Sequence, residues 1–155
     1  MTDCAMMDKM FHIIMKRMVQ SGQSPHYTEI ATELGLSTED GRKALHGLFA
    51  LGIGGWLVPD TDLISSLAPL SNRPNQYRIT IDGQQKWFAQ CGFESLAVCW
   101  LFPGKVVRVD CPCLDCELPI SIEIRDGDIL RVEPEGVTGY VAVPFWKWFD
   151  DLSGA

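Results

Sequence analysis

Apolar side chains recur at helical spacing in three successive segments of the first 52 residues. Residues 5–20 carry them three and four positions apart, at Met7, Met10, Phe11, Ile14, Met15 and Met18, which predicts a helix with one buried face. Residues 26–36 (HYTEIATELGL) predict a short second helix whose inward side chains are Ile30, Ala31 and Leu34. Residues 38–52 (TEDGRKALHGLFALG) predict a third helix, with Ser37 as its N-cap and Asp40 in a capping-box-like position.

Two strands are predicted to follow these helices. Residues 55–60 (GWLVPD) and 75–82 (NQYRITID) favour a hairpin with a long polar loop between its strands. Three helices and a hairpin form a winged helix-turn-helix, and TEIATELGLSTEDGRKAL has the helix-turn-helix pattern. Residues 1–82 are therefore predicted to form a winged-helix-like module.

The second half is predicted to combine a helix with a small sheet. Residues 83–102 (GQQKWFAQCGFESLAVCWLF) suggest one buried helix with Trp87, Cys91, Glu94, Val98 and Leu101 on a shared face. Alternating residues predict strands at 105–109, 120–124, 128–136 and 140–146. The predicted fold class is α+β: an N-terminal winged helix-turn-helix, then a helix and a small mixed or antiparallel β-sheet, with residues 83–155 as a thiol-bearing core.

Charge argues against nucleic acid as a partner. The chain has a net charge of -7, and its third predicted helix begins with Glu39 and Asp40. That helix offers only Arg42, Lys43 and His46 as donors, so little phosphate attraction is expected. DNA binding is therefore not expected, and the N-terminal module is interpreted as structural.

The chain also lacks the signals of export or membrane insertion. No run of 18 apolar residues predicts a transmembrane helix, and MTDCAMMDKM does not have the order of a secretory signal. The six cysteines are therefore interpreted as free thiols of a cytoplasmic protein rather than as disulfides. The sequence leaves the oligomeric state open, and a homodimer is compatible with it.

Three cysteines, Cys111, Cys113 and Cys116, lie between two predicted strands. Thiolates are soft donors that favour ions such as Zn, Cu(I) and Hg. A structural zinc site takes four ligands, and this segment supplies three. The cluster is thus a candidate soft-metal site, and the alternative is a turn with incidental small residues.

Cys91 is the second candidate, because Glu94 follows it three residues later. A carboxyl group beside a thiol can exchange a proton with it, and a buried carboxylate is costly unless it is paired or used. Gly92 costs a helix about 1 kcal/mol relative to alanine, which indicates that another group approaches closely there. The alternative is a cysteine that packs as a small hydrophobe, which is also the interpretation for Cys99.

Residues 75–144 contain, in this order, the segments QCGFESL, PGKVVRV, CPCLDC, PISIEI, VEPEG and YVAVP. These segments resemble the middle of the organomercurial (alkylmercury) lyases. That family shows a strand, a W-C-x-x-D-x-L helix, P-x-x-x-G, a V-R-V-like strand, a cysteine-containing turn, P-V-S-L-T-V, and V-x-P-x-G before a V-S-x-V-x-P strand. The resemblance implies a structural winged-helix module before the core and protonolysis of a carbon–mercury bond as the reaction.

The resemblance also implies roles for individual residues. The first catalytic cysteine corresponds to Cys91, the proton-carrying aspartate to Glu94, and a structural turn cysteine to Cys113, while Cys111 and Cys116 are additions. The family's second catalytic cysteine lies beyond the last matched strand, so the sequence is expected to be a C-terminally truncated relative. A cluster cysteine is expected to substitute for it, with its sulfur within about 4 Å of the Cys91 sulfur.

The sequence therefore predicts a lyase-like protein that binds an organometal or a soft metal ion through Cys91, Cys111, Cys113 and Cys116. Glu94 would protonate the carbon–mercury bond. Mercury would be substrate and product, zinc is the alternative ion, and no organic cofactor is expected. Two other functions stay open: a non-catalytic soft-metal protein, and a winged-helix regulator that responds to metal.

Overall fold

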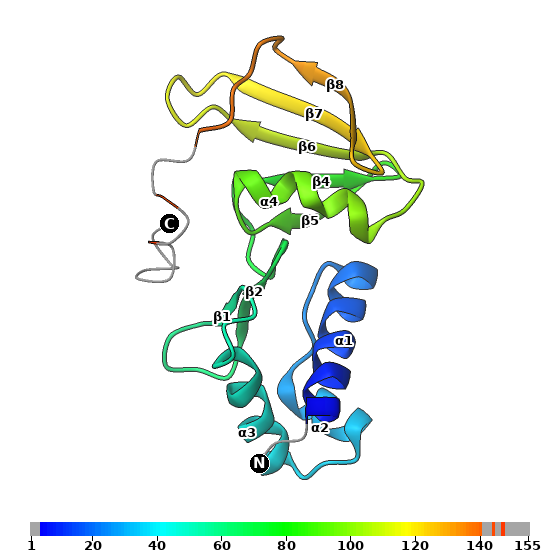
Figure 1. Ribbon diagram of the computed structural model, residues 1–155, viewed down its shortest axis with the longest axis vertical. Helices are drawn as coiled ribbons and strands as arrows, with labels where there is room; N and C mark the ends of the chain where they lie inside the picture. The colour runs from blue at the N-terminus through cyan, green and yellow to red at the C-terminus, as the bar shows by residue number, and fades with distance from the viewer. Residues whose placement is uncertain (1–3, 141–143, 145–146, 148–155) are drawn as a thin grey trace.

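The computed structural model describes residues 4–140 together with 144 and 147. Its N-terminal part contains the three predicted helices, α1 (Cys4–Ser21), α2 (Tyr27–Leu34) and α3 (Thr38–Phe49), which lie at one end of the molecule (Figure 1). The Asp40 N–H donates to Ser37 Oγ at 3.1 Å, and the Ser37 hydroxyl donates to the Asp40 carboxylate at 2.7 Å. The predicted cap of the third helix is therefore confirmed.

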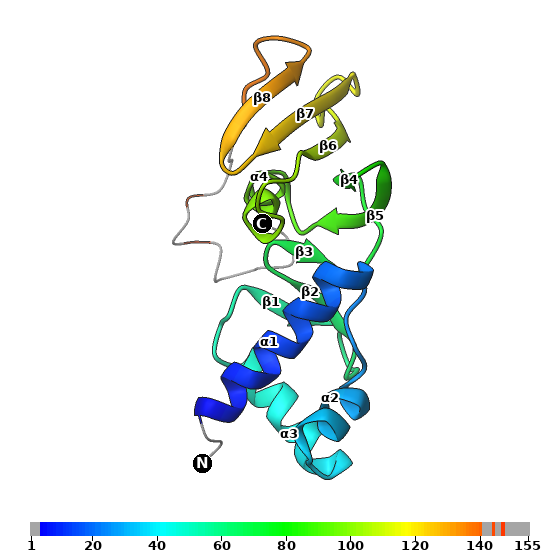
Figure 2. The same cartoon turned by 90° about the vertical axis from the view of Figure 1, so that its right-hand side faces the viewer.

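The described strands form one antiparallel sheet of eight strands in the order β1-β2-β3-β5-β4-β6-β7-β8. Their bounds are β1 Gly55–Leu57, β2 Ile64–Leu67, β3 Leu70–Ser71, β4 Arg78–Ile81, β5 Gln84–Ala89, β6 Val107–Pro112, β7 Pro119–Arg125 and β8 Asp128–Glu133. A short helix, α4 (Gly92–Ala97), and a 3₁₀ turn, η1 (Val98–Leu101), connect β5 to β6. Figures 1 and 2 agree that α4 lies against one face of β4 and β5. The α+β class and the antiparallel sheet are confirmed.

The predicted hairpin between 55–60 and 75–82 is wrong. β1 pairs with β2, whereas β4 pairs with β5 and β6. The serine-rich stretch between them resembles a polar loop, but it forms β2 and β3 with its serines buried. Hydrogen bonds accommodate these hydroxyls, as when Gln90 Nε2 donates to Ser66 Oγ at 2.7 Å.

The predicted helix over 83–102 is also wrong in its first half. Residues 84–89 form β5, so Trp87 lies in a strand and shares no helix face with Cys91. Asp82 and Gly83, at φ values of 51° and 76°, make the tight turn from β4 into β5. Asp-Gly is a strong signal for a two-residue hairpin turn, and it outweighs the helical spacing of the apolar residues that follow.

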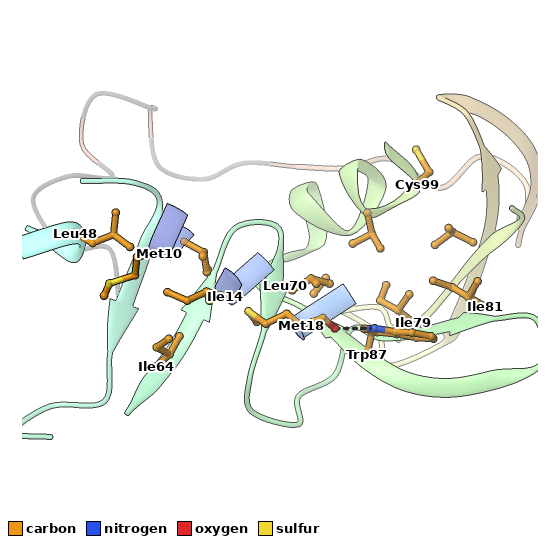
Figure 3. Close-up of a cluster of buried hydrophobic side chains, with 14 of the residues drawn as sticks. Met10, Ile14, Met18, Leu48, Ile64, Leu70, Ile79, Ile81, Trp87 and Cys99 are labelled. Atoms are coloured by element: carbon orange, nitrogen blue, oxygen red, sulfur yellow. Dashed lines mark hydrogen bonds between the residues drawn. The ribbon is translucent and has the colours of Figure 1, made fainter. Parts of the chain in front are cut away.

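One hydrophobic core joins the helices to the sheet (Figure 3). It includes Met10, Ile14 and Met18 of α1, strand residues such as Ile79, Val107 and Val109, and the predicted core residue Cys99. The Trp87 indole N–H donates to the carbonyl oxygens of Met18 and Val19, both at 3.0 Å, which ties β5 to the end of α1.

The predicted division at residue 82 falls in the β4–β5 turn, inside this continuous sheet. β4 and β5 pair across this boundary, so the two parts share one sheet, and the division into domains 1–82 and 83–155 stays a prediction. The strand predicted at 140–146 lies outside the described residues, apart from its first residue and Pro144. None of the described helices combines the length and apolar character needed to cross a membrane.

Candidate active site

Cys91 lies between the end of β5 and the first turn of α4. Its backbone is extended, at φ -148° and ψ 175°, and it is the N-cap of the helix. The Glu94 N–H donates to the Cys91 sulfur at 3.4 Å. The structure thus brings the predicted pair together, although through helix capping rather than through a shared face in the middle of a helix.

The Glu94 carboxyl group is partly withdrawn from solvent. Its Oε2 atom is buried and has no hydrogen-bond partner within the part of the chain that the structure describes. Burial raises the pKa of Glu94, and a hydrogen bond with Cys91 offsets part of that shift. Because desolvation penalises the charged form, this carboxyl group favours holding a proton beside the thiol.

The pKa of the Cys91 thiol is raised as well. Burial raises its pKa, the Glu94 N–H lowers it, and the Glu94 negative charge raises it again. Ionising either group makes ionisation of the other harder, so the pair favours states in which it holds at least one proton. A thiol and a carboxyl group in this arrangement can bind a soft electrophile and supply a proton next to it.

Tyr77 accounts for the glycine beside the thiol. A Cβ atom at Gly92 would lie 3.1 Å from Tyr77 Cε1 and 3.2 Å from its hydroxyl oxygen, so the expected close approach is confirmed. The backbone of Tyr77 is fixed on both sides, because its N–H donates to Asn75 Oδ1 at 2.9 Å and its carbonyl accepts from the Ala89 N–H at 3.0 Å. Sequence reasoning missed Tyr77, since only the fold places it next to residue 92.

The register of β4 and β6 places one cluster cysteine near Tyr77. Ile79 pairs with Val109 and Arg78 with Asp110, so the next positions along this antiparallel pair are Tyr77 and Cys111. Side chains alternate along a strand, which puts Tyr77 and Cys111 on the buried face of Ile79 and Val109. Among the three cluster cysteines, Cys111 therefore shares the sheet face that carries α4.

Cys113 and Cys116 lie farther along, in the turn between β6 and β7. The Cys113 N–H donates to the Leu118 carbonyl at 2.8 Å, and the Glu117 N–H donates to the Cys113 carbonyl at 3.0 Å. Hydrogen bonds from the Cys116 N–H, the Asp115 N–H and the Cys116 side chain lower the pKa of Cys113. Burial raises the pKa of Cys111, as do the neighbouring charges of Asp110 and Cys113.

The four predicted metal ligands do not form one site in the described residues. Across 4–140, 144 and 147, no three or more His, Cys, Asp or Glu side chains gather so that they could hold an ion. Neighbouring strands lie about 4.8 Å apart, so Cys111 on β6 is roughly two strand spacings, about 10 Å, from the end of β5, with Tyr77 between. The structure pairs Cys91 with Glu94 and Cys113 with Cys116, and the individual catalytic and metal assignments stay predictions.

The fold and this site define a class of α+β proteins in which a cysteine and a buried carboxyl group share the start of a short helix packed on an antiparallel sheet. The family model of alkylmercury lyase (MerB) matches residues 70–151, more than half of the chain. The chain therefore belongs to the alkylmercury lyase family, as the resemblance predicted.

Relatives of known sequence and structure agree with this assignment. The chain is 26% identical over 140 residues to the alkylmercury lyases of Bacillus cereus and Clostridium butyricum, an alignment that covers 88% of this chain and 57% of each relative. It thus spans just over half the length of those relatives. The crystal structure of the mercury-bound form of MerB2 matches with a TM-score of 0.63 and 18% identity, over 86% of this chain and 62% of that one. At this identity the match shows a shared fold.

Proposed function

We propose that this protein binds an organomercurial through the Cys91 thiolate and transfers a proton from Glu94 to the mercury-bound carbon. The observation that carries the proposal is the partly buried Glu94 carboxyl group. Its buried Oε2 has no partner in the described residues and lies one helical turn from a cysteine that caps the same helix. Membership of the alkylmercury lyase family supports it.

The reaction can be written with this chain's own groups. Cys91–SH displaces the thiolate of R–Hg–SR′, which forms Cys91–S–Hg–R and releases R′SH. The Glu94 carboxyl group then gives its proton to the carbon atom as the carbon–mercury bond breaks, and the electron pair of that bond forms the new C–H bond. The products are R–H, the Glu94 carboxylate and mercury held by the Cys91 sulfur, and no organic cofactor takes part.

The mercury left on Cys91 needs a second thiolate, because soft cations favour sulfur ligands. Cys111 is the cluster cysteine best placed for this, since it lies on the sheet face that carries α4 and one strand from Tyr77. Transfer to Cys111 would require the Tyr77 ring to move, or an external thiol to carry the ion. Free thiols suit a reducing cytoplasm, which is the proposed location.

The alternative is a soft-metal protein without catalysis, which would not require a buried acid. Incubation with phenylmercury or methylmercury and an excess of a small monothiol separates the two functions, with benzene or methane measured in the headspace. We expect hydrocarbon to accumulate over many turnovers. Mercury binding without hydrocarbon would favour the metal-binding function instead.

We infer that the N-terminal part, α1 to α3 with the β1–β2 hairpin, is a winged-helix module with a structural role. The cationic side chains of α3 are exposed, but each of them lies beside an acid. Asp62, in the β1–β2 connection, accepts from Arg42 Nε at 2.9 Å and lies 2.7 Å from His46 Nε2. Lys43 Nζ lies 3.4 Å from a Glu39 carboxylate oxygen. These acids compete with phosphate for each donor, which disfavours the regulator hypothesis.

We accordingly expect weak, sequence-independent binding to duplex DNA at physiological salt, measured by gel shift with a pool of random duplexes. The matched variant is Asp62→Asn, which frees Arg42 and His46 and should strengthen binding modestly at low salt, because phosphate contacts are electrostatic. Enrichment of a defined sequence at physiological salt would overturn the structural role and favour a regulator.

A further inference from the structure

The turn Cys113-Leu114-Asp115-Cys116 contains two thiols that the proposed reaction does not use. It joins β6 to β7 and is closed by the hydrogen bonds from Cys113 N–H to Leu118 and from Glu117 N–H to Cys113. Glu117 adopts a left-handed backbone, at φ 60°, which turns the chain after residue 116 so that the Leu118 carbonyl meets the Cys113 N–H. Cys116 and Leu114 are exposed, the latter at 76%, so the turn is open to solvent.

Cys113 and Cys116 lie on the same side of this turn, because the hydrogen bond from the Glu117 N–H to the Cys113 carbonyl closes one helical-type turn and residues three positions apart are neighbours on its surface. The Cys116 side chain hydrogen-bonds to the Cys113 sulfur, and the backbone N–H groups of Asp115 and Cys116 also point at it. Two thiols held in one short turn that is closed by backbone hydrogen bonds can bind one soft cation together. The turn is therefore a candidate dithiol site.

We propose that Cys113 and Cys116 form a two-thiolate site for a soft cation that favours linear coordination, Hg(II), separate from the Cys91–Glu94 site. The described residues supply no third His, Cys, Asp or Glu ligand, which disfavours the four-coordinate geometry of structural zinc. Two thiolates complete the coordination of Hg(II). The choice of ion rests on the proposed function, whose product is mercury held by thiols, whereas the dithiol geometry is independent of it.

Loading of this site is a ligand exchange. The Cys113 and Cys116 thiols take Hg(II) from its complex with two small thiols, Hg(SR)₂. Two new sulfur–mercury bonds form, two break, and the products are two RSH molecules that carry the protons of Cys113 and Cys116. The two protein sulfurs belong to one chelate with a high effective concentration, so the exchange is favourable even against an excess of monothiol.

The test is mercury retention in the full chain with Cys91 already replaced, so that failure of the lyase reaction cannot affect it. Cys91→Ser, Cys91→Ser/Cys116→Ser and the matched control Cys91→Ser/Cys4→Ser are loaded with mercuric chloride, desalted in a large excess of a monothiol, and assayed for mercury. Cys4 is exposed on α1 and lies outside the turn. Circular dichroism establishes that each variant is folded.

We expect Cys91→Ser and its Cys4 control to retain about one mercury per chain, and Cys91→Ser/Cys116→Ser to bind on the order of 10² times more weakly. Retention by the Cys116 variant would place the ion elsewhere and overturn the proposal. Failure of the Cys91→Ser parent to retain mercury, or equal losses in both double variants, would overturn it as well. Hydrocarbon release by the wild-type protein is measured separately, so each proposal can fail without the other.

Discussion

Cys91→Ser is expected to abolish hydrocarbon release and to remove organomercurial binding at the helix N-terminus. The substitution keeps a capping group at the start of α4, because a serine oxygen accepts the Glu94 N–H as readily as the sulfur does. It removes the soft ligand, since an alcohol neither ionises at neutral pH nor binds mercury as a thiolate does. Turnover should therefore fall to the uncatalysed background while the fold is retained.

The measurement is headspace hydrocarbon together with isothermal titration of phenylmercury. Cys4→Ser is the matched control, because it makes the same chemical change at an exposed site on α1 and should leave turnover unchanged. If Cys91→Ser still releases hydrocarbon, the reacting thiol lies elsewhere, and Cys111 becomes the first candidate.

Glu94→Gln should keep organomercurial binding and lose turnover by about 10²- to 10⁴-fold, the range typical of general acid catalysis. The amide is nearly isosteric with the carboxyl group and can hydrogen-bond, but it has no proton to transfer. Single-turnover measurements on the preformed phenylmercury complex isolate this step from binding. Glu94→Asp restores the residue implied by the family resemblance and should retain activity if the shorter side chain still reaches. A Glu94→Gln protein as fast as wild type would show that the proton comes from another group.

The pH dependence gives an independent check on Glu94. Because burial raises its pKa, the carboxyl group stays protonated above the usual carboxyl range, and cleavage of the bound organomercurial should fall as pH rises through the raised pKa. The same shift affects stability. The folded state binds this proton more tightly than the unfolded state, so the unfolding free energy should decrease as pH rises from the ordinary to the raised pKa.

Urea unfolding across that range should show the decrease in wild type and not in Glu94→Gln, which has no titrating group at this position. A flat wild-type profile would mean that the carboxyl group is solvated in solution. In that case the fall in activity with rising pH should also shift to the usual carboxyl range. Agreement between the two measurements distinguishes this outcome from a fault in either assay.

Local sequence was sufficient for several elements. The helical spacing of apolar residues in α1 to α3 and the Ser37 cap are local signals, and the structure has them as predicted. The alternating strands on either side of Cys111 and Cys116 are local as well, so β6 and β7 were predicted with the turn between them. Cys91 and Glu94 were singled out from their spacing, and capping at the start of α4 produces the same proximity.

Other features depended on contacts between distant segments. The buried serines of β2 and β3 do not look like strand residues in the sequence, and hydrogen bonds offset the cost of burying their hydroxyls. Gln90 Nε2 donates to Ser66 Oγ, and Ser71 Oγ donates to the Arg73 carbonyl. Residues 84–89 match a helix by spacing alone, yet the Asp82-Gly83 turn and pairing with β4 make them a strand. Short apolar segments are ambiguous in this way. The element against which such a segment packs, rather than its own spacing of apolar residues, decides whether it forms a helix or a strand.

The sequence by itself thus determined α1 to α3, the strands β6 to β8, the family resemblance and the neighbouring positions of Cys91 and Glu94. Only the tertiary structure decided which thiols come together. The antiparallel register of β4 and β6 brings Cys111 next to Tyr77, which lies 34 positions earlier in the chain. The packing of α4 brings Gly92 against Tyr77, 15 positions away. The tight β6–β7 turn instead joined Cys113 with Cys116. Strand register depends on the summed packing of whole strands, so spacing between cysteines does not reveal it.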